Sequence, residues 1–214
     1  FSDYREKYKI LRKEIHRRLL NKEETGDEVI LMSPYFMLND QWKKNLNYLL
    51  NHNKKVKLYT NSLGSTDAFY VAANFYRIIF DWQKKGLTPM IHDSSYGALT
   101  EVYDESVANA RWGMHSKTHI YDKDSAYIGT YNIDNRSDFY NAEMGIFCDG
   151  SESLVKDLKV NLNKRLKNSY EITGPGKAID NAGQAADVFG NASEEELKKM
   201  KMMKIPGLLF EFLM

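Results

Sequence analysis

The sequence predicts an α/β protein in which a mixed, mostly parallel β-sheet is sandwiched between helices. Two observations lead to this fold class. Between residues 28 and 92 short apolar runs alternate with segments of helical periodicity, and strand–helix–strand order favours parallel strands with helices on both faces. Residues 113–148, by contrast, have the pattern of consecutive strands joined by tight turns, which predicts an antiparallel portion.

The chain begins with a predicted amphipathic helix over residues 4–22, which makes up most of a first segment, residues 1–26. Its apolar residues recur at helical spacing, while Arg and Lys fill the opposite face. A basic helix of this kind can touch phospholipid or nucleic acid, but a solvated helix face is the more frequent explanation. We therefore expect an ordinary packed helix here.

The next segment, residues 27–170, holds the alternating strands and helices. Glu28–Ser33 is an apolar run that stops at Pro34, as expected for a strand buried on both faces. Asn39 or Asp40 is placed to cap the helix that follows. Further strands are expected at residues 56–60 and 87–92, and helices at residues 39–52, 66–85 and 151–168.

Residues 171–214 are expected to complete the same domain with a turn-rich loop, a short helix and an apolar tail. Small residues and turn formers at 173–193 predict a surface loop. Ser193 and Glu196 have the spacing of a capping box, which predicts a helix to about residue 204. We expect the apolar ending, IPGLLFEFLM, to dock on the domain core.

Composition limits the possible classes of function. The chain has 214 residues, 43% hydrophobic side chains and a net charge of +1, which predicts a globular domain without a global charge that attracts polyanions. The single Cys148 excludes an internal disulfide and a zinc site built from several cysteines. No apolar run approaches the roughly 20 residues that span a bilayer, and no signal-peptide pattern is visible.

The candidate site lies in residues 115–137, HSKTHIYDKDSAYIGTYNIDNRS. Residues two apart in a strand point to the same face, so His115 and Lys117 share a side, as do Thr130 and Asn132 on the next predicted strand. Together they offer two cationic or ionisable groups and two neutral hydrogen-bonding groups. This set of side chains is suited to holding a phosphate group.

The same residues are suited to phosphoryl transfer, which requires a positioned reacting group and neutralised charge on the phosphate oxygens. Lys117 can supply positive charge, while Thr130 and Asn132 can donate oriented hydrogen bonds. His115 can attack phosphorus or protonate a leaving oxygen, because imidazole titrates near neutral pH. A histidine in either role works best when an acid holds its second nitrogen, and Glu143 in NAEMGIF is the candidate.

The spacing of these residues resembles the signature of the phospholipase D superfamily. His115, Lys117 and Asp122 match H-x-K-x-x-x-x-D, and residues 129–132 match G-S-x-N except that threonine replaces serine. The resemblance implies cleavage or transfer of phosphodiesters through a phosphohistidine. We expect neither a metal nor another cofactor.

The resemblance also implies a role for each residue. In this superfamily the motif histidine, here His115, is the phosphohistidine nucleophile in one half and the general acid/base in the other. The motif lysine and asparagine bind phosphate, a downstream acid orients the histidine, and the motif aspartate is structural. Carried over, these residues are Lys117, Asn132, Glu143 and Asp122, with Thr130 as a tolerated phosphate-binding hydroxyl and Gly129, Arg136 and Ser137 in support.

Softer cues point to a subgroup. Residues 32–36 (MSPYF), 60–67 (TNSLGSTD) and 204–209 (KIPGLL) resemble the C-terminal half of bacterial cardiolipin-synthase-like proteins. The resemblance implies action on phospholipids, with association with the bacterial membrane or the cytoplasmic face of the inner membrane. It also implies a second motif, supplied by a region upstream of Phe1 or by a homodimer partner.

Other interpretations stay open. His115, His119 and Asp122 can be viewed as a metal trio, although Lys117 would repel a cation. The superfamily includes nucleases whose one-motif chains pair as homodimers, and the near-neutral charge argues mildly against nucleic acid. A third hypothesis is a phosphate-binding half-domain without turnover. The remaining histidines are expected to be surface or packing residues: His16, His52 and His92.

Overall fold

The computed structural model describes residues 9–95, 106 and 110–203. Its strands are β1 (Glu28–Met32), β2 (Lys55–Asn61), β3 (Thr88–His92), β4 (Thr118–Tyr121), β5 (Ser125–Gly129), β6 (Gly145–Cys148), β7 (Ser169–Gly174), β8 (Lys177–Ile179) and β9 (Ala185–Ala186). Its helices are α1 (Ile10–Leu19), α2 (Lys22–Thr25), α3 (Asp40–Asn51), α4 (Phe69–Lys84), the π-helix η3 (Arg136–Tyr140), α5 (Glu152–Leu166) and α6 (Glu194–Met202).

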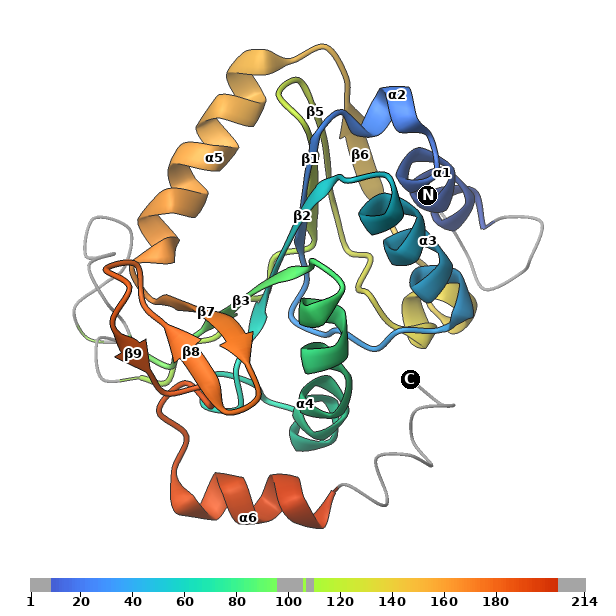
Figure 1. Cartoon of the computed structure of the whole chain (residues 1–214). Coiled ribbons are helices and arrows are strands. Elements are labelled where there is room, and N and C mark those ends of the chain that lie inside the picture. The colour runs from blue at the N-terminus through green and yellow to red at the C-terminus, as the bar shows by residue number, and fades with distance from the viewer. Residues whose placement is uncertain (1–8, 96–105, 107–109, 204–214) are drawn as a thin grey trace.

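The strands form one sheet in the order β6-β5-β4-β1-β2-β3-β7-β8-β9, which confirms the α/β class with a mixed sheet between helices (Figure 1). β1, β2 and β3 are parallel, and the remaining pairings are antiparallel. Of the helices that the structure describes, α5 lies on one face of the sheet, and α1, α3 and α4 lie on the other (Figure 1).

The sheet is mixed, but antiparallel pairings outnumber parallel ones, whereas a mostly parallel sheet was expected. Part of the difference arises because some of the predicted surface loop at residues 173–193 forms strands. β7 pairs with β3, and β8 and β9 continue the sheet outward. Gly176 and Gly183 have φ of +68° and +76°, values that glycine adopts readily in tight turns. Small side chains such as the buried Ala178 pack in these hairpins, so the composition that suggested a loop also fits short strands.

β1 shows why its sequence is continuously apolar. Val29 and Leu31 point into the large core beneath α1, α3 and α4, while Ile30 and Met32 point into a smaller core beneath α5. Because both faces of the strand are covered, the alternation of a half-exposed strand is absent, as the sequence predicts.

The helix ends follow local capping. The Asn39 side chain accepts a hydrogen bond from the Trp42 N–H at 3.0 Å, as predicted for the start of α3. Ser193 and Glu196 form the predicted capping box at α6. α4 begins at Phe69 rather than at residue 66 or 67, because the Thr66 hydroxyl accepts from the N–H of Ala68 in a preceding turn.

The predicted N-terminal helix ends at Leu19 as α1, and a separate short helix, α2, begins at Lys22. Asn21 separates them, since its side chain accepts a hydrogen bond from the Glu23 N–H at 3.0 Å and starts a new helix. Residues 4–8 of the predicted helix, and the whole of the predicted apolar tail, lie outside the described residues. None of the described helices is both long and apolar enough to cross a bilayer.

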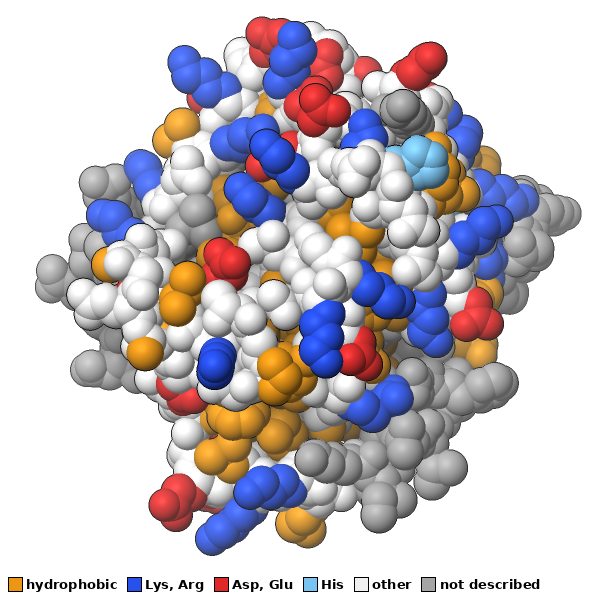
Figure 2. All heavy atoms as spheres, in the orientation of Figure 1, with side chains coloured by type: hydrophobic (Ala, Val, Ile, Leu, Met, Phe, Trp, Pro, Cys, Tyr) orange, Lys and Arg blue, Asp and Glu red, His pale blue; other side chains and the backbone are white. Residues whose placement is uncertain are grey.

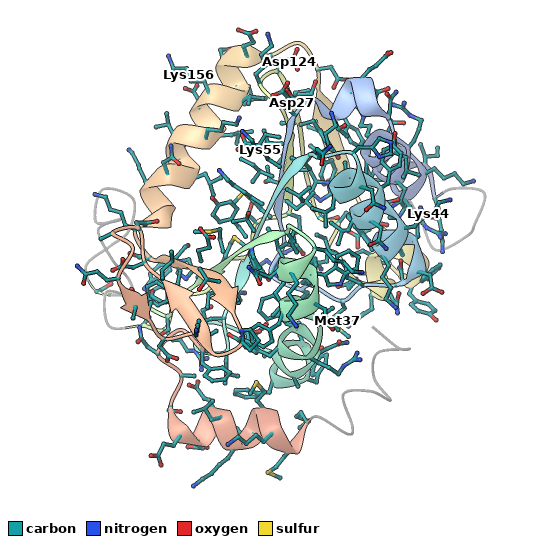
Figure 3. The ribbon with its side chains drawn as sticks, viewed as in Figure 1. Asp27, Met37, Lys44, Lys55, Asp124 and Lys156 are labelled. Atoms are coloured by element: carbon teal, nitrogen blue, oxygen red, sulfur yellow. The ribbon has the colours of Figure 1, made fainter. Side chains whose placement is uncertain are left out.

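His115, Lys117, Thr130 and Asn132 gather at one end of the sheet. Met37 lies near that end, and Asp27 and Asp124 lie at the opposite end (Figure 3). The Met37 N–H donates to the Ile133 carbonyl at 2.8 Å, which ties the segment after β1 to the segment after β5. Because β1 and β2 end here and β4 begins here, segments distant in sequence meet at this edge.

His119 lies beneath this end of the sheet and is fully buried among aromatic side chains. Its ring contacts Trp42, Tyr121 and Tyr127, and its Nδ1 lies 3.2 Å from the Tyr121 hydroxyl. Burial lowers the pKa of His119 from 6.5 to about 3, because the core disfavours the charged imidazolium. The neighbouring His16 lowers it further.

This burial predicts a pH dependence of stability. Below pH 6.5 the unfolded chain protonates His119 but the folded chain does not, so stability falls as the pH falls towards 3. His119→Phe keeps an aromatic ring in the core and removes the titrating imidazole. The free energy of unfolding of the wild type, relative to that of the variant, should fall by about 2 kcal/mol between about pH 6.5 and about pH 5. Urea unfolding checks this, and equal pH slopes for both proteins would contradict it.

Candidate active site

His115 and Lys117 lie in the extended segment that enters β4, and Thr130 and Asn132 lie in the segment that leaves β5. The Gly129 N–H donates to the Lys117 carbonyl at 3.1 Å, so the strand pairing continues to the motif. These side chains share one open hollow of about 530 Å³. Its lining consists of His115, Lys117, Gly129, Thr130, Asn132, Asn141, Ala142 and Glu143.

His115 and Lys117 are in direct contact. The Lys117 Nζ lies 2.7 Å from Nδ1 and 3.1 Å from Nε2 of the exposed His115 ring, and it donates to the His115 carbonyl at 2.9 Å. Partial burial and, after it, the charge of Lys117 lower the pKa of His115 below 6.5. At neutral pH the imidazole is therefore uncharged, which is the state that a nucleophile needs.

Lys117 is a largely buried cation, 8% exposed. Burial lowers its pKa, while the carboxylates of Glu143, Asp134 and Asp67 act in the opposite direction. An ammonium that lines the hollow and is kept charged by nearby carboxylates is suited to neutralise a phosphate oxygen.

Asn132 and Thr130 present polar groups to the same hollow. The Asn132 backbone N–H is fixed by the Ser137 hydroxyl at 3.0 Å. The buried Asn132 Oδ1 has no hydrogen-bond partner among the described residues. Thr130 is fixed by two groups, since its hydroxyl donates to Glu143 and accepts from the Met144 N–H at 3.0 Å.

Glu143 is buried and lines the hollow, but the expected contact with a ring nitrogen of His115 is not among the hydrogen bonds of the described residues. Its carboxylate accepts instead from Thr130, from the Ser137 hydroxyl at 2.8 Å and from the Asn141 amide at 3.0 Å. These three donors satisfy the carboxylate and hold it beside the ammonium of Lys117. Glu143 therefore holds Thr130, Ser137 and Asn141 in place around the hollow.

The four residues predicted to support the site differ in burial and in their distance from the hollow. Ser137 is buried and joins Asn132 to Glu143, whereas Arg136 is exposed on η3 and lies outside the lining of the hollow. Gly129 is packed against the Tyr127 hydroxyl, and a Cβ there would lie 2.2 Å from that oxygen. Asp122 lies beyond the far end of β4, where its side chain packs on Gly26.

The metal trio does not assemble. His115 and Asp122 lie at opposite ends of β4, and His119 is enclosed in the core between them. In the part of the chain that the structure describes, no group of three or more His, Cys, Asp or Glu residues is placed to hold a metal ion.

Asn61 is a site residue that the sequence reasoning missed. Its Oδ1 accepts from the Met114 N–H at 2.7 Å, and its Nδ2 donates to the Met114 carbonyl at 2.9 Å. This two-point contact fixes the backbone immediately before His115. A signal was present, because Asn61 lies in the TNSLGSTD segment at the end of a predicted parallel strand.

A buried polar network supports η3 from below. His16 Nε2 lies 3.0 Å from Asp138 Oδ1, and His16 Nδ1 lies 2.6 Å from the Asn45 amide. Asn39 donates to the other oxygen of Asp138. Because Asp138 follows Ser137, this network holds the turn that fixes Glu143. His16 is thus a packing residue, as expected, with a polar role that its sequence context did not reveal.

The chain is an α/β domain in which a histidine, a lysine and an asparagine surround one hollow at the end of a mixed sheet. A family model described as "Cardiolipin synthase, PLD-like domain" matches residues 17–166. The chain belongs to this family, and hence to the phospholipase D superfamily.

Two curated relatives show the level of sequence similarity. "Cardiolipin synthase C" of Escherichia coli (strain K12) is 28% identical over 136 residues, or 61% of this chain. An uncharacterized protein of Helicobacter pylori (strain ATCC 700392 / 26695) is 24% identical over 149 residues, or 68% of this chain. Each alignment covers 28% of the relative, so the chain spans well under half the length of these proteins.

Solved structures show the same fold at low sequence identity. Phosphatidylserine synthase of Haemophilus influenzae Rd KW20 is 15% identical with a TM-score of 0.61, over 93% of this chain and 44% of that chain. Nuc of Salmonella typhimurium, a phospholipase D family member, is 13% identical with a TM-score of 0.55, over 75% of this chain and 90% of that chain.

Proposed function

We propose that this chain supplies one of two half-sites of a phospholipase D-type enzyme that acts on phospholipids, by phosphatidyl transfer or hydrolysis. The observation that carries the proposal is the contact of His115 with Lys117 in a hollow that also holds Asn132, Thr130 and Glu143. The proposal is supported by this combination, because phosphoryl transfer needs a reacting group, a cation and oriented polar groups around one phosphate.

In the proposed reaction a ring nitrogen of neutral His115 attacks phosphorus. A P–N bond forms while the P–O bond to the leaving alkoxide breaks, and the alkoxide takes a proton from the histidine of the second half-site. That histidine then accepts a proton from water or an alcohol. The activated oxygen attacks phosphorus, forms a P–O bond and releases His115.

The other residues have supporting roles in this proposal. Lys117 and the Asn132 side chain bind the phosphate oxygens, and the Thr130 hydroxyl completes the cradle. Glu143 is a positioning residue that holds Thr130 and acts on Lys117 through its charge. Asp122 and Gly129 shape the strand ends. No step requires a metal or another cofactor.

Phospholipid is the favoured substrate class. The matching family model and the cardiolipin synthase relative support it, and so does the near-neutral charge. Figure 2 shows Lys and Arg side chains spread over one face of the molecule with Asp and Glu between them, unlike a continuous basic groove. We also propose that the protein works at a bacterial membrane.

A second candidate is a nuclease that works as a homodimer. It is favoured by the fold match to Nuc, because the match covers 90% of the Nuc chain and the two chains therefore share a domain of similar extent. The two candidates differ in substrate and share the proposed chemistry.

A comparison of substrates tests the proposal. The complete protein is incubated with phosphatidylglycerol vesicles or with single-stranded oligonucleotides, and products are measured by mass spectrometry, with His115→Ala as the background. We expect phospholipid turnover at least about 100-fold above oligonucleotide cleavage, a ratio typical of discrimination by a site built for one substrate class. The reverse ratio would favour the nuclease, and absence of turnover with both would leave a phosphate-binding domain.

A further inference from the structure

A second hollow of about 460 Å³ lies between α5 and the end of the sheet that carries the motif, and His115 lines both hollows. Met32 of β1 and two leucines of α5, Leu158 and Leu162, form the apolar wall of the second hollow. Met32 and Leu162 belong to the small core beneath α5, and Leu158 packs against that core. The second hollow is therefore an open end of an apolar layer, next to the proposed nucleophile.

The two hollows lie on opposite sides of the segment that enters β4. Successive residues of an extended segment point to opposite sides, and Lys117 lines the first hollow while Ser116 and Thr118 line the second. The first hollow contains the ionisable side chains of Lys117 and Glu143. Among the described residues that line the second hollow, His115 alone is ionisable. The second hollow is thus suited to an uncharged, largely apolar group.

Hydrogen-bond donors lie beside the apolar wall. Ser116 Oγ is 2.9 Å from Thr118 Oγ1, so one of these hydroxyls donates to the other. This bond uses one of their two hydrogens, and the other can be donated to a carbonyl oxygen. The amide of Asn161, an exposed residue of α5 that lines the same hollow, is a further donor. An apolar wall beside hydroxyl and amide donors matches acyl chains that are joined through ester carbonyls.

The proposed chemistry indicates which part of a phospholipid needs this place. In the covalent intermediate the phosphatidyl group is attached to His115, and the head-group alcohol has left. Because attacking and leaving atoms are roughly in line, the leaving alcohol and the incoming acceptor lie on the side of phosphorus opposite His115. The diacylglycerol part stays bonded to phosphorus through both steps, so it needs a binding site beside His115.

We propose that the hollow between α5 and the sheet binds the ester and acyl-chain part of the phospholipid, while the phosphate occupies the first hollow. This inference rests on the proposed function, because it requires a lipid substrate. It makes Leu158, Asn161 and Leu162 residues that determine the preference for acyl-chain length.

The test narrows the hollow from an exposed position. Asn161→Trp places a large ring at the hollow, and Asn163→Trp is the matched control, since Asn163 is also exposed on α5 but lines a different hollow. In the complete protein, kcat/KM is measured with dibutyroyl- and dihexanoyl-phosphatidylglycerol, below the concentrations at which these lipids form micelles. The preference for the longer chains is the ratio of the two values within each protein.

Wild type and Asn163→Trp should prefer the longer chains by about 10-fold or more, because burial of each methylene favours binding about 4-fold. Asn161→Trp should reduce this preference to about 2-fold or less, because the ring takes the place of the added methylenes. Leu158→Asn makes the wall polar without filling the hollow, and it should lower the preference about 4-fold or more.

An equal chain-length preference in all four proteins would overturn the inference. If Asn161→Trp keeps the preference and instead lowers transfer to added glycerol relative to hydrolysis, the hollow holds the acceptor alcohol, which also overturns the inference. In both results the lipids are still turned over, so the proposed function stands. Wild-type turnover of both lipids no higher than that of His115→Ala would overturn the proposed function and this inference together.

Discussion

Replacing His115 by asparagine should lower the rate of phosphodiester turnover by about 10⁴-fold or more, because the proposed covalent intermediate forms on the His115 ring. Asparagine keeps polarity and approximate size, and His115 is exposed, so the fold should be retained. Steady-state kinetics with a phospholipid, together with circular dichroism, measure the two expectations.

His52→Asn is the matched control for this substitution. His52 is an exposed histidine at the C-terminal end of α3, where its Nδ1 lies 2.8 Å from the Tyr48 carbonyl. The control should leave turnover unchanged. A tenfold change in rate corresponds to about 1.4 kcal/mol in activation free energy. If the activity of His115→Asn is within 10-fold of the wild type, His115 does not take part in the chemistry.

Replacing Lys117 by methionine should lower turnover by about 10²- to 10³-fold, because one charged group that stabilises the transition state is lost. The charge of Lys117 also contributes to the lowered pKa of His115, so the variant should show a higher His115 pKa. Burial, the larger cause, remains, and the pKa should stay below 6.5. Titration of the His115 ring signals by NMR measures this shift.

The pH dependence of the activity follows from the lowered pKa of His115. His115 attacks in its neutral form, so wild-type activity should rise with pH through a pKa below 6.5, and this acidic limb should move upward in Lys117→Met. Lys123→Met, at an exposed lysine that pairs with Glu152, is the matched control and should change neither quantity. An unchanged His115 pKa in Lys117→Met would show that the two groups are not coupled.

The sequence was a good guide to elements with strong local signals. The apolar run at residues 28–33 and the cap at Asn39 predicted β1 and α3, because burial on both faces and a capping side chain leave clear patterns. β8 and β9 were missed because hairpins of two or three small residues have no periodicity, and their pairing depends on neighbours distant in sequence.

The site residues that belong to a motif of fixed spacing could be predicted from the sequence. The partners of residues held by tertiary contacts could not. The motif spacing of His115, Lys117 and Asn132 anticipated one shared hollow. The partners of Glu143 could not be read from the sequence, because the donors Thr130 and Ser137 meet it through the folding of η3. The contact of Asn61 with Met114 is likewise long-range. The TNSLGSTD segment indicates that Asn61 lies near the site, but not which backbone it holds.

The central claim, that His115 attacks phosphorus, is tested most directly by trapping the intermediate. The complete protein is mixed with a phospholipid, quenched with base to preserve phosphohistidine, digested and analysed by mass spectrometry. The account predicts a phosphorus-containing adduct on the peptide that contains His115, absent from His115→Asn. Turnover at the wild-type rate with no adduct on that peptide, under conditions that preserve a phosphohistidine standard, would contradict it.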